Sequence, residues 1–130
     1  MDIGQRALDY HKSGYNCAQS VFAACCEYTG MDEKTALALS AGFGGGARSG
    51  ELCGAVTGAI MAEGLVFPFN DGQDTEAKDK IAAIAKQCVA IAREKYGYVR
   101  CADLKGNINC SEIIAFMAKT AEDIMKKEKN

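Results

Sequence analysis

The sequence predicts an all-α fold: a compact bundle of about five to six helices that fills residues 1–130 as a single domain, with a glycine-rich loop before the fourth helix. Alanine is frequent and proline occurs once, which favours helices over sheets. Glycines recur at positions that divide the chain into helix-length segments. Because no stretch of about four to eight residues alternates between apolar and polar side chains, we expect essentially no strand.

Helix-end signals place each element in order. The expected helices cover residues 2–13, 16–28, 32–41, a fourth that begins within 49–52 and ends by 67, 74–96 and 111–127. Asn16 is a good N-cap for the second helix, Pro68 cannot continue the fourth, and Gly97 ends the fifth and longest. The glycine-rich loop over 42–50 separates the third helix from the fourth, and residues 101–104 are expected to form a further short turn.

Composition excludes several classes of protein. The chain has 130 residues, 48% of them hydrophobic and 25% charged, with a net charge of -2, which is typical of a soluble globular protein without a basic field for nucleic acid. The most apolar segment, residues 55–69, contains Glu63 and Pro68 and is shorter than the ~20 residues of a membrane-spanning helix. Residues 1–6 lead into polar residues rather than an apolar stretch. We therefore expect a cytoplasmic protein with no membrane insertion.

The chain contains seven cysteines, and a reducing compartment changes how they are interpreted. There, cysteines that are not core residues are more often metal-binding or catalytic than disulfide-bonded, and an odd number argues against a complete set of bridges. Cys88 continues an apolar helical face with Ile84 and Ile91, and Cys25 and Cys26 lie in mid-helix. We expect these three cysteines to be core residues.

The other four cysteines, Cys17, Cys53, Cys101 and Cys110, stand at expected helix starts. Free amide donors and the positive end of the helix dipole gather there and stabilise a thiolate, which is both the nucleophile and the metal-binding form. Helical spacing also directs them inward, so they are predicted to converge on one site as catalytic residues or metal ligands. No Cys-x-x-Cys pair is present, so tertiary folding would have to assemble the site. Four unrelated buried cysteines remain the alternative.

Three motifs carry a family resemblance: Asn16-Cys17-Ala18-Gln19-Ser20-Val21, Gly44-Gly45-Gly46 and Cys53-Gly54-Ala55-Val56-Thr57-Gly58, followed by Cys101 and Cys110. Together they resemble the C_GCAxxG_C_C family of redox-active proteins, whose hallmark is four cysteines, one of them within a Cys-Gly-Ala-x-x-Gly segment. The resemblance spans residues 16–110 and places the family's cysteines at the four positions chosen above. It implies a redox or iron–sulfur role. A related domain occurs in split-Soret cytochromes, where an iron–sulfur cluster accompanies haem, but this chain has no Cys-x-x-Cys-His, so covalent haem is not expected.

Glycines are expected to contribute to the same site. The loop lacks the Gly-Lys-Ser/Thr ending of a P-loop, which argues against nucleotide binding. We expect Gly44, Gly45, Gly46 and Gly54 to let backbone approach a bound cofactor, with amides directed at sulfur or at an anionic ligand. Gly54 and Gly58 also give the fourth helix a small face for tight packing at the bundle centre.

The only histidine, His11, lies among polar residues and is expected at the surface, and Glu63 is expected to be exposed to solvent.

Three functions remain open at this point. The four cysteines could serve a redox protein, through an iron–sulfur cluster or through reversible disulfides. They could instead hold zinc or another metal that stabilises the fold. The domain could also be a helical interaction module with non-functional cysteines. A redox partner protein is expected for the first function, while enzymatic activity and assembly as a homodimer stay open.

Overall fold

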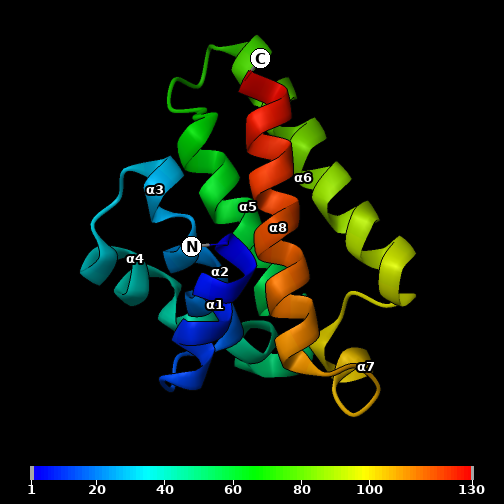
Figure 1. Ribbon diagram of the computed structural model, residues 1–130. Helices are drawn as coiled ribbons and strands as arrows, with labels where there is room; N and C mark the ends of the chain where they lie inside the picture. Colours follow the sequence, from blue (N-terminus) through cyan, green and yellow to red (C-terminus); the bar gives the residue numbers. More distant parts are fainter. Residues whose placement is uncertain (1, 130) are drawn as a thin grey trace.

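Residues 2–129, which the computed structural model describes, form eight α-helices and no strand, so the all-α class is confirmed (Figure 1). The helices are α1 (Ile3–Lys12), α2 (Cys17–Ala24), α3 (Cys26–Thr29), α4 (Glu33–Ser40), α5 (Gly54–Val66), α6 (Thr75–Tyr96), α7 (Cys101–Leu104) and α8 (Cys110–Lys129). Within the same residues, no helix is both long enough and apolar enough to cross a membrane.

The predicted number of five to six helices is too low, for two local reasons. The expected helix over 16–28 is interrupted at Cys25, whose backbone angles of φ -86° and ψ 1° separate α2 from α3. Residues 101–104 form a complete short helix, α7. The glycine-rich segment also differs from a plain loop. Ala41–Phe43 forms a 3₁₀ turn, and the Glu51 N–H donates to the Gly46 carbonyl at 3.1 Å, which closes a wide turn over Gly46–Gly50.

The predicted helix-end signals at Asn16, Pro68 and Gly97, in contrast, are confirmed. The Asn16 side chain accepts from the Gln19 backbone N–H, and the Gln19 side chain accepts from the Asn16 N–H, which completes a capping box for α2. Gly97 ends α6 in the left-handed conformation. Helix α5 ends at Val66, two residues before Pro68.

Helix α5 lies at the centre of the bundle and packs against α2, α6 and α8. Its buried positions are mostly small residues, which lets the neighbouring helices approach closely. At Gly58, a methyl group would stand 2.7 Å from the Ala18 carbonyl oxygen of α2, which is closer than a carbon atom can approach. This contact confirms that Gly58 serves tight packing.

Two segments far apart in the sequence meet beside the start of α5. The Cys53 N–H donates to the Val99 carbonyl at 2.8 Å, and the Cys101 N–H donates to the Glu51 carbonyl at 2.7 Å. Helix α7 follows directly and lies at the end of the molecule where α8 begins (Figure 1). The helix starts that carry Cys53, Cys101 and Cys110 are therefore drawn towards one end of the bundle.

Candidate functional site

A cavity of about 220 Å³ lies at this end of the bundle, and all four cysteines at helix starts line it. They come from the starts of four helices. Cys17, Cys101 and Cys110 are the first residues of α2, α7 and α8, and Cys53 directly precedes α5. Apolar side chains complete much of the wall, among them those of Leu104, Ile108 and Ile113. Folding thus brings together residues that are separated by up to 93 positions along the chain, from Cys17 to Cys110.

The four cysteines differ in exposure. Cys53 is buried, Cys17 and Cys101 are half-buried, and Cys110 is exposed. The expectation that all four point inward is therefore wrong for Cys110, which occupies the first position of α8, one turn before the buried Ile113. Cys110 therefore lies at the solvent-exposed edge of the cavity.

Cys17 is the cysteine whose surroundings favour a thiolate. A hydrogen bond from the Cys53 thiol lowers the pKa of Cys17, and so do the backbone N–H groups of Gly45, Ala18 and Cys17 itself, while partial burial opposes them. Cys17 occupies the first turn of α2, where amides have no partner within the helix. These donors outweigh the cost of burial, so the pKa of Cys17 is lowered and its surroundings favour the predicted thiolate.

At Cys53 and Cys101 the surroundings oppose the expected thiolate. The pKa of Cys53 is raised, first because this thiol donates a hydrogen bond to the Cys17 sulfur and second because it is buried. The pKa of Cys101 is raised by burial and by the nearby charges of Cys17 and Cys110. The prediction from helix position is therefore wrong for Cys53 and Cys101, because neighbouring sulfurs and burial outweigh the helix amides there.

Two of the four predicted glycines lie against the cysteines. A methyl group at Gly54 would stand 2.4 Å from the Cys17 Sγ, so only glycine leaves room for that sulfur. Gly45 lines the cavity and directs its N–H at Cys17. Gly44 and Gly46 have structural contacts instead: a methyl group at Gly44 would overlap the Asn16 side chain, and one at Gly46 would overlap the Glu51 backbone.

The N–H of Gly45 is aimed by an unusual backbone turn. Four successive residues, 45–48, have positive φ angles, and two of them, Ala47 (φ 60°) and Arg48 (φ 61°), are not glycine. This conformation costs an L-residue roughly 1–2 kcal/mol. The glycine-rich segment is therefore a strained left-handed turn that places an amide beside the Cys17 sulfur.

His11, which was expected at the surface, is half-buried and also lines the cysteine cavity. The ring is half-buried, and Nδ1 lies 3.1 Å from the Tyr15 carbonyl oxygen. The sequence signal that could have found it is helical spacing, because His11 follows the buried Ala7 by four positions on α1.

Glu63 is completely buried, contrary to the expectation of solvent exposure. Burial raises its pKa to about 8, and the neighbouring Cys88 thiol offsets part of that rise. Cys88 and Cys25 are fully buried, as predicted, whereas Cys26 is half-buried. None of these three cysteines lines the cavity of the other four.

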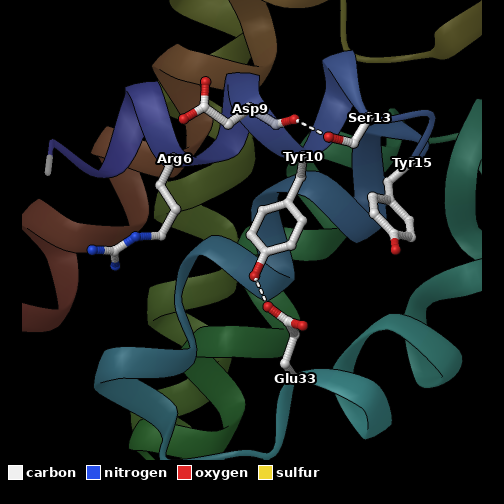
Figure 2. A pocket seen from close by; sticks show the side chains of 6 residues that line it. All are labelled: Arg6, Asp9, Tyr10, Ser13, Tyr15 and Glu33. Carbon is white, nitrogen blue, oxygen red and sulfur yellow. Dashed lines mark hydrogen bonds between the residues drawn. The ribbon is translucent and has the colours of Figure 1, made fainter.

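A larger cavity, of about 480 Å³, lies elsewhere on the surface and contains no sulfur. Figure 2 shows its lining: Tyr10 reaches from α1 to donate a hydrogen bond to Glu33, while Ser13 donates to the Asp9 carbonyl. The Tyr15 ring stands beside that of Tyr10. No cysteine lines this cavity, and it does not belong to the cysteine site.

The family model for "Putative redox-active protein (C_GCAxxG_C_C)" matches residues 15–124. This match covers most of the chain and includes all four cavity cysteines. The chain belongs to this family. No curated protein and no solved structure matches it significantly.

Proposed function

We propose that the protein is a redox protein whose cavity cysteines, Cys17, Cys53, Cys101 and Cys110, bind an iron–sulfur cluster used for electron transfer. The observation that carries this proposal is the convergence of these four residues, from four elements, on one cavity. Four cysteine thiolates are the usual ligand set of such clusters. Membership of a family described as redox-active points to the same chemistry.

The family description favours a redox-active group over one zinc ion. The family is described as redox-active, and zinc has no redox chemistry of its own.

Each residue of the site would have a defined part. Cys17 offers a thiolate, whereas Cys53 must release the proton that it shares with Cys17. The apolar side chains of Leu104, Ile108 and Ile113 would cover part of the centre. The amide N–H of Gly45 would remain directed at sulfur, and such hydrogen bonds raise the reduction potential of a bound cluster.

A second candidate, reversible thiol–disulfide chemistry, is favoured by the contact between Cys17 and Cys53. The Cys17 thiolate and the Cys53 thiol are hydrogen-bonded to each other, so their sulfurs are neighbours. Formation of a disulfide between them would release two electrons to an acceptor and the remaining proton of the pair to solvent. This pair uses only two of the four cysteines, which is why the cluster is the first proposal.

Anaerobic reconstitution tests the proposal. The apoprotein is incubated with ferrous iron and sulfide, and iron, sulfide and visible absorption are then measured per chain. We expect stable incorporation in the wild type, loss of incorporation in Cys17→Ser, and normal incorporation in the control Cys26→Ser, which alters a half-buried cysteine outside the cavity. A wild-type protein that binds no iron but forms a Cys17–Cys53 disulfide on mild oxidation would support the second candidate instead.

A further inference from the structure

The mouth of the cysteine cavity, where Cys110 and Lys105 are exposed to solvent, carries positive charge, although the chain as a whole has a net charge of -2. Within residues 2–129, Lys105 is the only lysine, arginine or acidic residue that lines the cavity. We propose that this mouth is the contact surface for a redox partner protein, and that the partner meets it with a patch of acidic side chains. The inference rests on the proposed function and extends it, because it names the charge of the partner and the place where it docks.

Cys110 is the cysteine at which a partner can come closest to the site. It is exposed, whereas Cys53 is buried and Cys17 and Cys101 are half-buried. Helix α7 begins with Cys101 and α8 with Cys110, and the segment between these helices projects from this end of the bundle (Figure 1). Electron transfer and thiol exchange both require that the reacting groups approach closely. A partner therefore has to contact the surface around Cys110.

Lys105 contributes one positive charge to this surface. Its backbone N–H donates to the Cys101 carbonyl at 2.9 Å, so Lys105 lies one helical turn after Cys101 and on the same face. The side chain is exposed, and among residues 2–129 no carboxylate forms an ion pair with it. The charge of Lys105 also offsets part of the rise in the pKa of Cys101, as expected for a cation beside that sulfur.

Arg48 contributes a second positive charge, from the glycine-rich turn. Its Nη1 lies 3.9 Å from the position that a methyl group on Gly45 would take, so the guanidinium folds back over a residue that lines the cavity. Arg48 is exposed, and it too forms no ion pair within the part of the chain that the structure describes. Arg100, in contrast, is paired with Glu51 at 3.4 Å. The charges of Arg48 and Lys105 are therefore available to a partner.

The acidic side chains nearby do not line the cavity. Asp103 is on α7 and Glu112 is on α8, the helices that begin with the cavity cysteines, but neither belongs to the cavity wall. Complementary charges across an interface speed the encounter of two proteins and fix their orientation, whereas like charges suppress wrong partners. Redox encounters are among the smallest protein interfaces, so a few charges can decide them. The two unpaired cations therefore favour an acidic partner over a basic one.

Matched peptide disulfides test this inference in the apoprotein, without any cluster. Three short peptides each carry one cysteine activated as a pyridyl disulfide, flanked by glutamates, by glutamines or by lysines. A protein thiolate displaces pyridine-2-thione and forms a mixed disulfide with the peptide, and the absorbance of the released thione gives the rate. Each rate is divided by the rate of the same peptide with free 2-mercaptoethanol, which removes differences in intrinsic reactivity. All measurements use the Cys26→Ser background, because Cys25 and Cys88 are buried and only cavity cysteines then remain accessible.

The expected result is a preference for negative charge that depends on the two cations. At low ionic strength the glutamate peptide should react about threefold faster than the glutamine peptide, and the lysine peptide should react more slowly than both. Lys105→Met and Arg48→Met should each lower the glutamate-to-glutamine ratio by about twofold, while Lys105→Arg should keep it. The preference should disappear at ~1 M salt, where the Debye length is about 3 Å. Lys127→Met is the matched control, because it removes the same charge near the far end of α8, and it should keep the wild-type ratio.

The outcomes separate this inference from the proposed function. Equal rates for the three peptides, or the fastest reaction with the lysine peptide, would overturn the acidic partner. An equal loss of preference in Lys127→Met would also overturn it, because the preference would then come from the overall charge of the chain. If such a protein still incorporates iron and sulfide, the proposed function stands without this docking surface. If the protein prefers the glutamate peptide but binds no iron, the docking surface stands and serves the thiol–disulfide candidate.

Discussion

Glu63 makes the stability of this protein depend on pH, and its replacement by glutamine should remove that dependence. The carboxyl is fully buried in α5, and neither oxygen has a hydrogen-bond partner of normal geometry among residues 2–129. Burial raises its pKa to about 8 from the ordinary value of 4.5, while Cys88 offsets part of the rise. Cys25, which lies near enough to sense the charge of Glu63, is a neutral thiol in this range. Between pH 4.5 and about pH 8, Glu63 is therefore protonated in the folded protein and ionised in the unfolded chain.

The size of the effect follows from the two pKa values. Below pH 4.5 the carboxyl is protonated in both the folded and the unfolded state, so it does not make the free energy of unfolding depend on pH. Between the two pKa values the free energy of unfolding falls by ~1.4 kcal/mol for each pH unit, because only the unfolded state is ionised. A change from about pH 5 to about pH 8 should therefore cost ~4 kcal/mol. Above the folded pKa both states are ionised and the slope disappears.

Urea denaturation at several pH values between 5 and 8 provides the measurement. Glu63→Gln should lose the downward slope that the wild type shows, because glutamine is neutral throughout, whereas titrations elsewhere are common to both proteins. The exposed Glu94 of α6 gives the matched control, and Glu94→Gln should keep the wild-type slope. Identical slopes in wild type and Glu63→Gln would refute the reasoning. An infrared band of a protonated carboxyl in the wild type at pH 7 checks the same point without a variant.

The remaining predictions concern the cysteine site and its glycine surroundings. Gly54→Ala should displace the Cys17 sulfur and raise the pKa of that thiol, whereas Gly64→Ala on the same helix, where a new methyl group meets nothing, should stabilise the fold by up to ~1 kcal/mol. The alkylation rate of Cys17 and the unfolding temperature are measured in both variants. If Gly54→Ala and Gly64→Ala change these two quantities equally, the close contact at Gly54 is contradicted. At pH 7, brief alkylation followed by mass spectrometry should label Cys17 faster than the more exposed Cys110, because the pKa of Cys17 is lowered; the reverse order would count against a thiolate at Cys17. Ala47→Gly should stabilise the protein by about 1 kcal/mol in chemical denaturation, since it relieves a positive φ at an exposed residue, and a loss of stability would argue that the turn is not strained.

Helix boundaries were largely predictable because their signals are local. Asn16 caps α2, Gly97 ends α6, and Pro68 follows the end of α5, as expected from the residues alone. The break at Cys25 was not predictable in the same way, since no glycine or proline marks it. The next short helix packs against α5, and that tertiary contact is absent from any local pattern.

The members of the candidate site were also predictable, but their protonation was not. Position at a helix start correctly selected the four cysteines that line one cavity. The same argument assigned a thiolate to Cys53, whose pKa is instead raised by Cys17 and by burial. Which of two adjacent sulfurs keeps the proton depends on the amides around each one, and Cys17 receives an additional N–H from Gly45, 28 positions away in the sequence (45 − 17).

By itself, the sequence determined the all-α class, most helix ends and the set of four cysteines, because periodicity, capping and glycine punctuation act within a few residues of one another. Only the tertiary structure decided that Glu63 is buried, that His11 lies on the cysteine cavity, and that the pKa is lowered at Cys17 but raised at Cys53. Each of these depends on which distant element covers the side chain. Burial and the neighbouring charges that set a pKa are properties of packing between helices, and the order of residues along one helix does not contain them.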